Sequence, residues 1–296
     1  MIYDFKNLCN LAENFFTHFR MILFPNAKIN IGLNIVKKRK DGFHDIETVF
    51  YPIGLSDILE VIENTSSSKN IFRSSGIKIP GNANENLCLK AHQLIKQDYD
   101  IPAVKIHLHK TIPIGAGLGG GSSDAAFCIK IIDGLFHLNL SWGEKHHYAR
   151  QIGSDCSFFV TNKPAFAEGK GDHLESANLN LTGYYFILVN PDIHISTASA
   201  YAGASAKKPK NSLEELIATL PVSKWKNNIE NDFENSIFVK YPSIKKIKQQ
   251  LYDLGATYAS MSGSGSSVYG IFYSPPEEKK LRKHFKDWFI WQDWLK

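Results

Sequence analysis

The sequence predicts an α+β fold of two lobes, with mainly antiparallel sheets and a ligand-binding site between the lobes. Three observations lead to this prediction. From Ile22 onward the chain is rich in short, apolar or alternating segments that are typical of strands. A glycine-rich loop separates an alternating strand from a helical run near the middle of the chain. Beyond about residue 170 a second pattern of strands and helices begins, and no internal repeat is present.

The first half of the chain is strand-rich. Segments in which apolar residues predominate or alternate with polar ones are expected to form strands: 29–36, 48–53, 57–62 and 104–110. The alternation in the last of these favours an antiparallel sheet with one face in water. Segments with apolar residues at helical spacing, or in a helical run, are expected to form helices: 86–95, 125–136 and 142–152.

The second half contains fewer strands. Strands are expected where apolar residues run together, at 184–189 and 268–272. Helices are expected at 196–204, 213–220 and 242–254. The tryptophan-rich segment 276–296 is expected to be one closing helix that packs against the body of the protein.

These segments suggest a division of the chain into three parts. Residues 21–170 are expected to form an N-terminal domain and residues 171–296 a C-terminal domain. Residues 1–20 have acidic and polar residues where a signal peptide needs a basic region and an apolar core. Because Met21 begins a segment that looks like a natural start, we expect residues 1–20 to be an appendage outside the active machinery.

The composition narrows the class of function. The chain has 296 residues, of which 43% are hydrophobic and 21% charged, as in ordinary globular proteins. Its net charge of +5 suits anionic small molecules. The basic clusters 37–40 and 207–210 are interpreted as solvated loops, because no nucleic-acid-binding module accompanies them. We therefore expect neither a nucleic-acid nor a membrane partner, and a monomer or a homodimer.

Cysteine usage and hydropathy indicate the compartment. None of the four cysteines forms a Cys-x-x-Cys pair, which argues against a zinc or redox motif and favours a reducing compartment, the cytoplasm. The chain contains no run of 18 apolar residues, the length that a membrane-spanning helix needs.

The glycine-rich loop carries the clearest functional signal. Glycines let backbone N–H groups approach a ligand closely, and the following helix start adds unpaired donors and positive partial charge. The loop therefore predicts a polyphosphate site. A Walker loop needs a lysine before its Ser/Thr, but Ser122 follows Gly121 directly. The pattern Gly115-x-Gly117-x-x-Gly120 fits a Rossmann fingerprint only formally, because no acidic residue ends a strand about 20 residues later.

The loop resembles the ATP-binding motif of the GHMP kinases, a superfamily that includes galactokinase, homoserine kinase and mevalonate kinase. This resemblance implies a two-lobed GHMP kinase fold, ATP as co-substrate and Mg²⁺ as its metal. The ATP-binding residues it implies are Pro113, Ile114, Gly115, Ala116, Gly117, Leu118, Gly119, Gly120, Gly121, Ser122 and Ser123. The metal ligands stay undetermined, because Ser122 and Ser123 are equally placed to reach the ion.

Further motifs resemble one branch of these kinases, which phosphorylates the 2-hydroxyl of a cytidyl diphosphate-methylerythritol in the non-mevalonate route to isoprenoid precursors. The resemblance extends from Met21 to about Phe272. Its motifs are Pro25-Asn-Ala-Lys28-Ile-Asn30, Asp41-Gly42-Phe43-His44, Gly153-Ser-Asp155, Asn190-Pro191 with Ser196-Thr197 and Tyr201, and Met261-Ser-Gly-Ser-Gly265.

The resemblance implies roles for individual residues. Lys28 and Asp155 would be the catalytic pair, with Asp155 orienting or deprotonating the 2-hydroxyl and Lys28 stabilising charge on the moving phosphoryl group. The substrate would be bound by Asn30, Phe43, His44, Thr197 and Tyr201. The family often has tyrosine where this chain has Phe43, a change that keeps the aromatic ring and removes a hydroxyl.

Alternatives remain open at the level of the sequence. Without the resemblance, Asp155 is equally well explained as a helix cap at a turn between a helix and an apolar strand. Another GHMP kinase of the homoserine or mevalonate type would share the glycine loop but not Asp41-Gly42-Phe43-His44. A GHMP-fold protein that binds a ligand without catalysis is a second alternative, against which the presence of both Lys28 and Asp155 argues.

Overall fold

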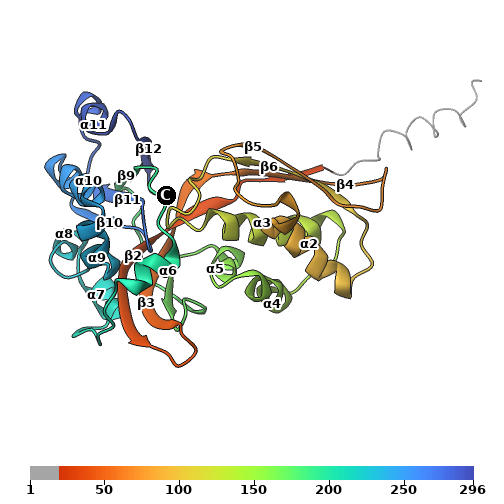
Figure 1. The fold of residues 1–296 in the computed structure, drawn as a ribbon, viewed down its shortest axis with the longest axis horizontal. Coiled ribbons are helices and arrows are strands. Elements are labelled where there is room, and N and C mark those ends of the chain that lie inside the picture. Colours follow the sequence, from red (N-terminus) through yellow and green to blue (C-terminus); the bar gives the residue numbers. More distant parts are fainter. Residues whose placement is uncertain (1–19) are drawn as a thin grey trace, which may run out of the picture.

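The computed structural model describes residues 20–296 (Figure 1). Most of the proposed N-terminal appendage, residues 1–19, lies outside the described residues. No helix in the described part of the chain is long and apolar enough to span a bilayer.

The first lobe is a four-stranded sheet covered by helices on one face (Figure 1). The strand order is β1 (Arg20–Leu23), β4 (Ile58–Glu63), β6 (Val104–Lys110) and β5 (Ile71–Gly76). All neighbours are antiparallel except β5 and β6, which are parallel. The helices of this lobe are α2 (Leu87–Asp98), α3 (Gly120–Leu135), α4 (Trp142–Ile152) and α5 (Cys156–Thr161), and the 3-10 turn η1 (Ala83–Glu85) precedes them.

Strand β6 and helix α4 confirm two predictions. In β6 Ile106 and Leu108 are buried against the helices while His107 between them is exposed, as the alternation predicted. Helix α4 has the predicted bounds. It begins after Ser141, which forms a capping box with Glu144 and so satisfies the N–H groups that a helix start leaves free.

A second antiparallel sheet, in the order β2 (Asn26–Lys38), β3 (His44–Ser56), β7 (Ala165–Glu168) and β8 (His173–Ser176), lies between the helices of the first lobe and the second lobe (Figure 1). Strands β2 and β3 are longer than predicted and are paired through several register shifts. The predicted domain division at residue 170 falls in the turn between β7 and β8, and it stays a prediction.

The second lobe contains an antiparallel sheet in the order β10 (Tyr258–Met261), β11 (Val268–Phe272), β9 (Tyr185–Asn190) and β12 (Phe289–Trp294). Its helices are α6 (Thr197–Ala202), α7 (Leu213–Thr219), α8 (Val222–Trp225), α9 (Phe233–Lys240), α10 (Pro242–Asp253) and α11 (Glu278–Phe285). One apolar cluster joins the middle sheet to the sheet of the second lobe. In it, Ile29 of β2 and Val49 of β3 belong to the same core as Phe186 of β9 and Tyr269 of β11.

Two predicted elements are wrong. The segment 276–296 is not one helix, because α11 ends at Phe285 and Phe289–Trp294 pairs with β9 as strand β12. Its aromatic residues favour strands, and β9 offers a free edge for pairing. The apolar run after Asp155 is helix α5 rather than a strand, since a short buried run fits either structure by periodicity alone.

Candidate active site

The glycine-rich loop connects β6 to α3, and the helix begins at Gly120, before the predicted start at Ala125. Gly115, Gly117 and Gly119 have φ values of 64°, 78° and 69°, a region that favours glycine. Gly119 precedes the helix and offers no side-chain cap, so the first N–H groups of α3 have no partner within the helix. Such a helix start is suited to bind an anion.

The loop is held from both lobes. The backbone N–H of Lys28 donates to the carbonyl of Leu118 at 3.0 Å. Ser262 Oγ, from the segment between β10 and β11, donates to the carbonyl of Gly117 at 2.9 Å. A Cβ on Gly117 would lie 2.0 Å from the carbonyl oxygen of Ser262. Only glycine therefore allows the two loops to approach this closely.

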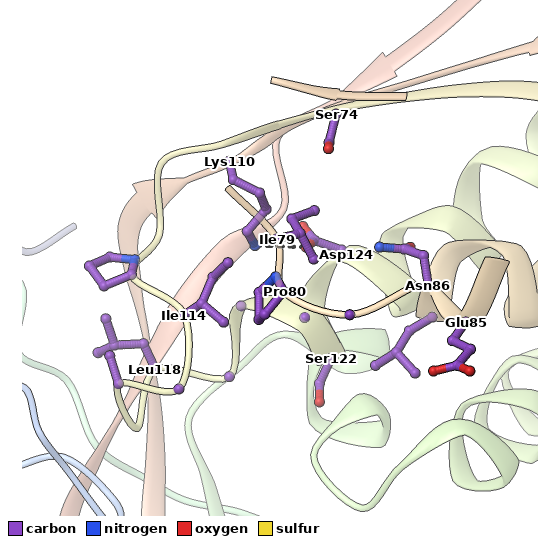
Figure 2. A pocket seen from close by; sticks show the side chains of 18 of the residues that line it. Ser74, Ile79, Pro80, Glu85, Asn86, Lys110, Ile114, Leu118, Ser122 and Asp124 are labelled. Atoms are coloured by element: carbon purple, nitrogen blue, oxygen red, sulfur yellow. Dashed lines mark hydrogen bonds and ion pairs between the residues drawn. The ribbon is translucent and has the colours of Figure 1, made fainter. Parts of the chain in front are cut away.

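A cavity of about 510 Å³ opens beside the loop; we call it the loop cavity (Figure 2). Its wall opposite the loop comes from the segment before α2 and from the first residue of that helix, where Ile79, Pro80 and Leu87 are apolar and Asn86 is polar. An apolar slot with a few polar groups, next to a phosphate cradle, has the character of a nucleoside site. No motif in the sequence predicted this wall.

A buried charge cluster lies under the loop. The Lys110 ammonium contacts Asp57. It also donates to Asp124 Oδ2 at 2.8 Å, as Figure 2 shows. Asp57 also accepts the backbone N–H groups of Thr111 and Ile112. The other oxygen of Asp124, Oδ1, is buried without a hydrogen-bond partner. Two carboxylates therefore share one ammonium, and Asp124 is the less well satisfied of the two.

The pKa values in this cluster follow from burial and charge. Burial raises the pKa of Asp124 to about 7, although the attraction of Lys110 acts in the opposite direction. Burial alone would lower the pKa of Lys110, but the neighbouring carboxylates outweigh it, so that pKa is raised. Sequence reasoning missed the whole cluster, although a lysine at an inward position of an alternating strand is an unusual feature that marks it.

Lys28 and Asp155 form the predicted pair. Lys28 Nζ lies 3.4 Å from Asp155 Oδ2 and donates to Asn30 Oδ1 at 2.7 Å. Asp155 does occupy the N-cap position of α5, but its side chain makes no capping hydrogen bond. The alternative explanation of Asp155 as a side-chain cap therefore lacks its defining contact, and the carboxylate faces Lys28 instead.

Asn30 fixes the position of Lys28. Its side chain is buried, accepting from Lys28 and donating Nδ2–H to Thr48 Oγ1 at 3.0 Å. The Lys28 ammonium also lies 4.4 Å from the centroid of the Phe50 ring, a cation–π contact. The long lysine side chain is thus held in one place, next to the Asp155 carboxylate.

A second cavity, of about 750 Å³, contains the pair; we call it the lobe cavity. Among the residues predicted to bind substrate, Asn30, Phe43, Thr197 and Tyr201 line it. It shares Gly115, Gly117 and Gly119 with the loop cavity. The glycine-rich loop therefore lies between the two cavities, with Lys28 and Asp155 on the lobe-cavity side.

The predicted aromatic residues are arranged in an unexpected way. The ring of His44 stacks on that of Tyr201, with centroids 4.7 Å apart and planes 14° from parallel. Tyr201 also meets the edge of Phe233, and its pKa is raised by burial and by the charge of Asp155. Phe43 is 59% exposed, with Lys170 Nζ 5.1 Å from its ring centroid. Sequence reasoning missed Lys170, Arg150 and His194 in this cavity.

Comparisons with known proteins identify the family of this chain. Residues 86–163 match the GHMP kinases N terminal domain, and residues 211–290 match the GHMP kinases C terminal model. A 4-diphosphocytidyl-2-C-methyl-D-erythritol kinase of Bacteroides fragilis is 50% identical over 277 residues, which cover 93% of this chain and 100% of the relative. The enzyme of the same name from Azobacteroides pseudotrichonymphae is 52% identical, over 86% of this chain and 94% of the relative.

Solved structures show the same relationship. A crystal structure of a 4-(cytidine 5'-diphospho)-2C-methyl-D-erythritol kinase matches with a TM-score of 0.75 and 28% identity, over 92% of this chain and 98% of that one. A homoserine kinase from Cytophaga hutchinsonii, with a TM-score of 0.62 and 15% identity, shares the fold. The chain belongs to the GHMP kinases and, within them, to the family of the 4-diphosphocytidyl-2-C-methyl-D-erythritol kinases.

Proposed function

We propose that this chain transfers the γ-phosphoryl group of ATP to the 2-hydroxyl of 4-diphosphocytidyl-2-C-methyl-D-erythritol, a step in the non-mevalonate route to isoprenoid precursors. The observation that carries this proposal is the position of Lys28 and Asp155 beside the phosphate cradle that the two cavities share. A phosphoryl group held by the loop would there meet a hydroxyl bound in the lobe cavity.

The phosphates of ATP would lie against residues 113–123, and the base would enter the loop cavity. Asp155 would accept the proton of the substrate hydroxyl as its oxygen bonds to the γ-phosphorus and the bond from that phosphorus to the β-phosphate oxygen breaks. ADP is the leaving group. Lys28, held by Asn30, would stabilise the negative charge on the moving phosphoryl group.

The cytidyl group would be bound at the other end of the lobe cavity. Phe43 and Tyr201 line that cavity and would face the two sides of the cytosine ring, with His44 and Thr197 as polar partners. Since His44 stacks on Tyr201 in the structure, this arrangement requires the His44 ring to give up that stacking when the base binds.

Mg²⁺ fits the site as an ion held mainly by the nucleotide. The described residues contain no group of three or more His, Cys, Asp or Glu side chains placed to hold a metal. Magnesium commonly binds through substrate phosphates with one or two protein ligands, and the hydroxyl of Ser122, which lines the loop cavity, would be one of them. When bound, Mg²⁺ would neutralise charge on the phosphates.

A substrate panel tests the proposal. The purified chain is incubated with ATP and Mg²⁺ and with the cytidyl substrate, mevalonate or homoserine in turn, and ADP formation is measured. We expect turnover with the cytidyl substrate alone. Turnover with mevalonate or homoserine would instead favour another GHMP kinase, and ATP binding without turnover would favour a non-catalytic protein.

The cytoplasm is the compartment we propose for this activity. Cys88, Cys128 and Cys156 are buried free thiols, which suits a reducing environment.

A further inference from the structure

The side chain that holds the Asn30 amide belongs to Thr48, on the neighbouring strand β3. Thr48 is buried, and its hydroxyl makes two hydrogen bonds. Oγ1 donates to the backbone carbonyl of Gly32 at 2.6 Å and accepts Nδ2–H of Asn30 at 3.0 Å. Thr48 lines neither the loop cavity nor the lobe cavity, so any influence on the reaction has to pass through its neighbours.

The direction of these bonds follows from which groups can donate. A carbonyl oxygen only accepts, so the single hydroxyl proton of Thr48 is used on Gly32. Towards Asn30 the hydroxyl oxygen can then only accept, which turns the NH2 of the amide to Thr48 and its Oδ1 away. The ammonium of Lys28 has donors only, and this Oδ1 is the acceptor it meets at 2.7 Å. The carbonyl of Gly32 thus determines, through Thr48, which end of the amide faces Lys28.

A β-bulge supplies that carbonyl. The pairing of β2 with β3 passes from Ile31–Val49 to Leu33–Thr48, so Gly32 has no partner opposite it. Gly32 has a φ of 64°, and a Cβ there would lie 2.7 Å from a side-chain carbon of α7. Only glycine therefore fits the bulge.

The second lobe holds the bulge in place. The backbone N–H of Leu33 donates to the carbonyl of Glu230 at 2.9 Å, and the carbonyl of Leu33 accepts the N–H of Asp232 at 2.8 Å. Asp232 Oδ2 also accepts the N–H of Ile35 at 2.8 Å. The position of the bulge, and with it the carbonyl offered to Thr48, is fixed by both lobes.

We propose that Thr48 is a positioning residue for Lys28 and acts by setting the orientation of the Asn30 amide. This inference rests on the proposed function, in which Lys28 stabilises charge on the moving phosphoryl group. Without the hydroxyl, the NH2 of Asn30 loses its buried acceptor, and nothing on this side prevents the amide from turning over. A turned amide presents a donor to the Lys28 ammonium, which then loses the contact that holds it beside the reacting group.

The test compares Thr48→Val, which keeps the branched shape and removes the hydroxyl, with Thr48→Ser, which keeps the hydroxyl. Thr219→Val is the matched control, because the exposed Thr219 also donates its hydroxyl to a backbone carbonyl, that of Glu215 at 2.7 Å, outside both cavities. For each protein we would measure kcat, the KM for ATP and for the cytidyl substrate, and the urea midpoint of unfolding.

Thr48→Val is expected to lower kcat about 10- to 100-fold, the range for a displaced reacting group. The KM for ATP and for the substrate should stay within about threefold, because Thr48 touches neither ligand site. Thr48→Ser should retain kcat within about threefold, and Thr219→Val should leave all kinetic constants unchanged. A role in folding alone would instead shift the urea midpoint and leave the kcat of the folded protein intact.

A double-mutant cycle with Asn30→Ala shows whether the effect passes through the amide. In the Asn30→Ala background, adding Thr48→Val should lower kcat by less than about threefold, since the group that Thr48 orients is gone. Should Thr48→Val not fold, Thr48→Ala takes its place in the cycle, because it removes the same hydroxyl without placing a methyl group against the amide.

An unchanged kcat in the folded Thr48→Val or Thr48→Ala variant would overturn the inference. So would an equal loss of kcat with and without the Asn30 side chain, or a loss in Thr48→Ser as large as that in Thr48→Val. Failure of the proposed function would look different: the unmodified protein would show no turnover with the cytidyl substrate, and this inference would fall with it.

Discussion

Asp155 combines the geometry of a helix cap with the surroundings of a catalytic base. It stands at the N-cap of α5, yet its carboxylate makes no capping bond and lies 3.4 Å from Lys28 Nζ. We expect Asp155→Asn to lower kcat by roughly two to four orders of magnitude while ATP still binds, because the amide cannot accept the hydroxyl proton. Steady-state kinetics and ATP titration measure both effects.

Asp155→Ser separates the two explanations of this residue. Serine is as good a helix cap as aspartate, so a capping role predicts near-normal activity and stability for this variant. A catalytic role predicts the same loss of turnover as in Asp155→Asn. Recovery of turnover by serine would contradict the catalytic assignment.

Substitutions of Tyr201 test whether aromatic stacking binds the cytosine base of the substrate. Among residues 20–296 no hydrogen bond to the Tyr201 hydroxyl is found, whereas its ring stacks on His44 and meets Phe233. We expect Tyr201→Ala to raise the KM for the cytidyl substrate about 5- to 150-fold, the equivalent of 1–3 kcal/mol for a base–aromatic stack, with little change for ATP. Tyr201→Phe should cost much less. Equal losses in the two variants would assign the effect to the hydroxyl.

The raised pKa of Asp124 predicts that the stability of the fold depends on pH. This pKa is raised from 3.8 to about 7, so the folded protein favours the neutral carboxyl. The loss of folding stability that ionisation of Asp124 causes is absent below about pH 4 and grows as pH rises toward 7. Asp124→Asn should therefore stabilise the fold at pH 8, by at most about 4 kcal/mol, and much less at pH 4.5. Urea unfolding at both pH values measures this difference.

The control for this experiment is Asp100→Asn, since Asp100 is exposed. Its effect should be small at both pH values. The same gain in stability for Asp124→Asn at pH 4.5 and at pH 8 would show that the benefit comes from packing and not from the titration of this carboxyl.

At the scale of elements, the loop between β6 and α3 depends on backbone conformation. Gly119 has a φ of 69°, and a Cβ there would lie 3.0 Å from the Phe159 ring and 3.2 Å from the Lys28 side chain. We expect Gly119→Val to weaken ATP binding at least about tenfold, because it strains the loop and crowds the Lys28 side chain. Calorimetric titration with ATP measures the loss.

Gly143→Ala is the matched control for this substitution. Gly143 lies in α4 outside both cavities, and a Cβ there would make only an ordinary contact at 3.8 Å. It should leave ATP affinity unchanged and stabilise the helix slightly. If Gly119→Val folds and binds ATP normally, the loop is not the phosphate cradle.

The sequence predicted those elements whose own residues determine them. The capping box at Ser141 and the alternation of β6 are local signals, and both elements were found. Strand β12 depends instead on pairing with β9, and α5 on burial of its phenylalanines, so neither could be inferred from a local pattern.

The same distinction applies to the site. Lys28, Asp155 and the loop lie in recognisable motifs, whereas Arg150 and Lys170 reach the lobe cavity only through the packing of α4 and of the β7–β8 turn. The apolar wall around Ile79 likewise becomes part of a cavity only when the loop folds against it.

At the scale of the whole molecule, the second lobe supports the glycine-rich loop of the first. Ser262, which donates to the carbonyl of Gly117, also accepts the backbone N–H of Asn30. The segment that carries it is held by Asn231, whose Nδ2 donates to the carbonyls of Met261 and Gly263, each at 2.8 Å. A chain of hydrogen bonds thus connects a buried asparagine of the second lobe to the loop and to the residue that positions Lys28.

This chain predicts that Asn231→Ala affects both stability and ATP binding. The variant leaves the Gly263 carbonyl and the N–H of Phe233 without their Asn231 partner and removes one of two donors to the Met261 carbonyl. Because the site is 2% exposed, this should cost about 2–4 kcal/mol of unfolding free energy. Because Gly117 loses firm support, the KM for ATP should also rise severalfold. Asn228→Ala removes an exposed bond to the Lys224 carbonyl and should change neither quantity. Urea unfolding and ATP kinetics on the two variants decide the matter: a destabilised Asn231 variant with a normal KM for ATP would mean that the second lobe stabilises the fold without supporting the cradle.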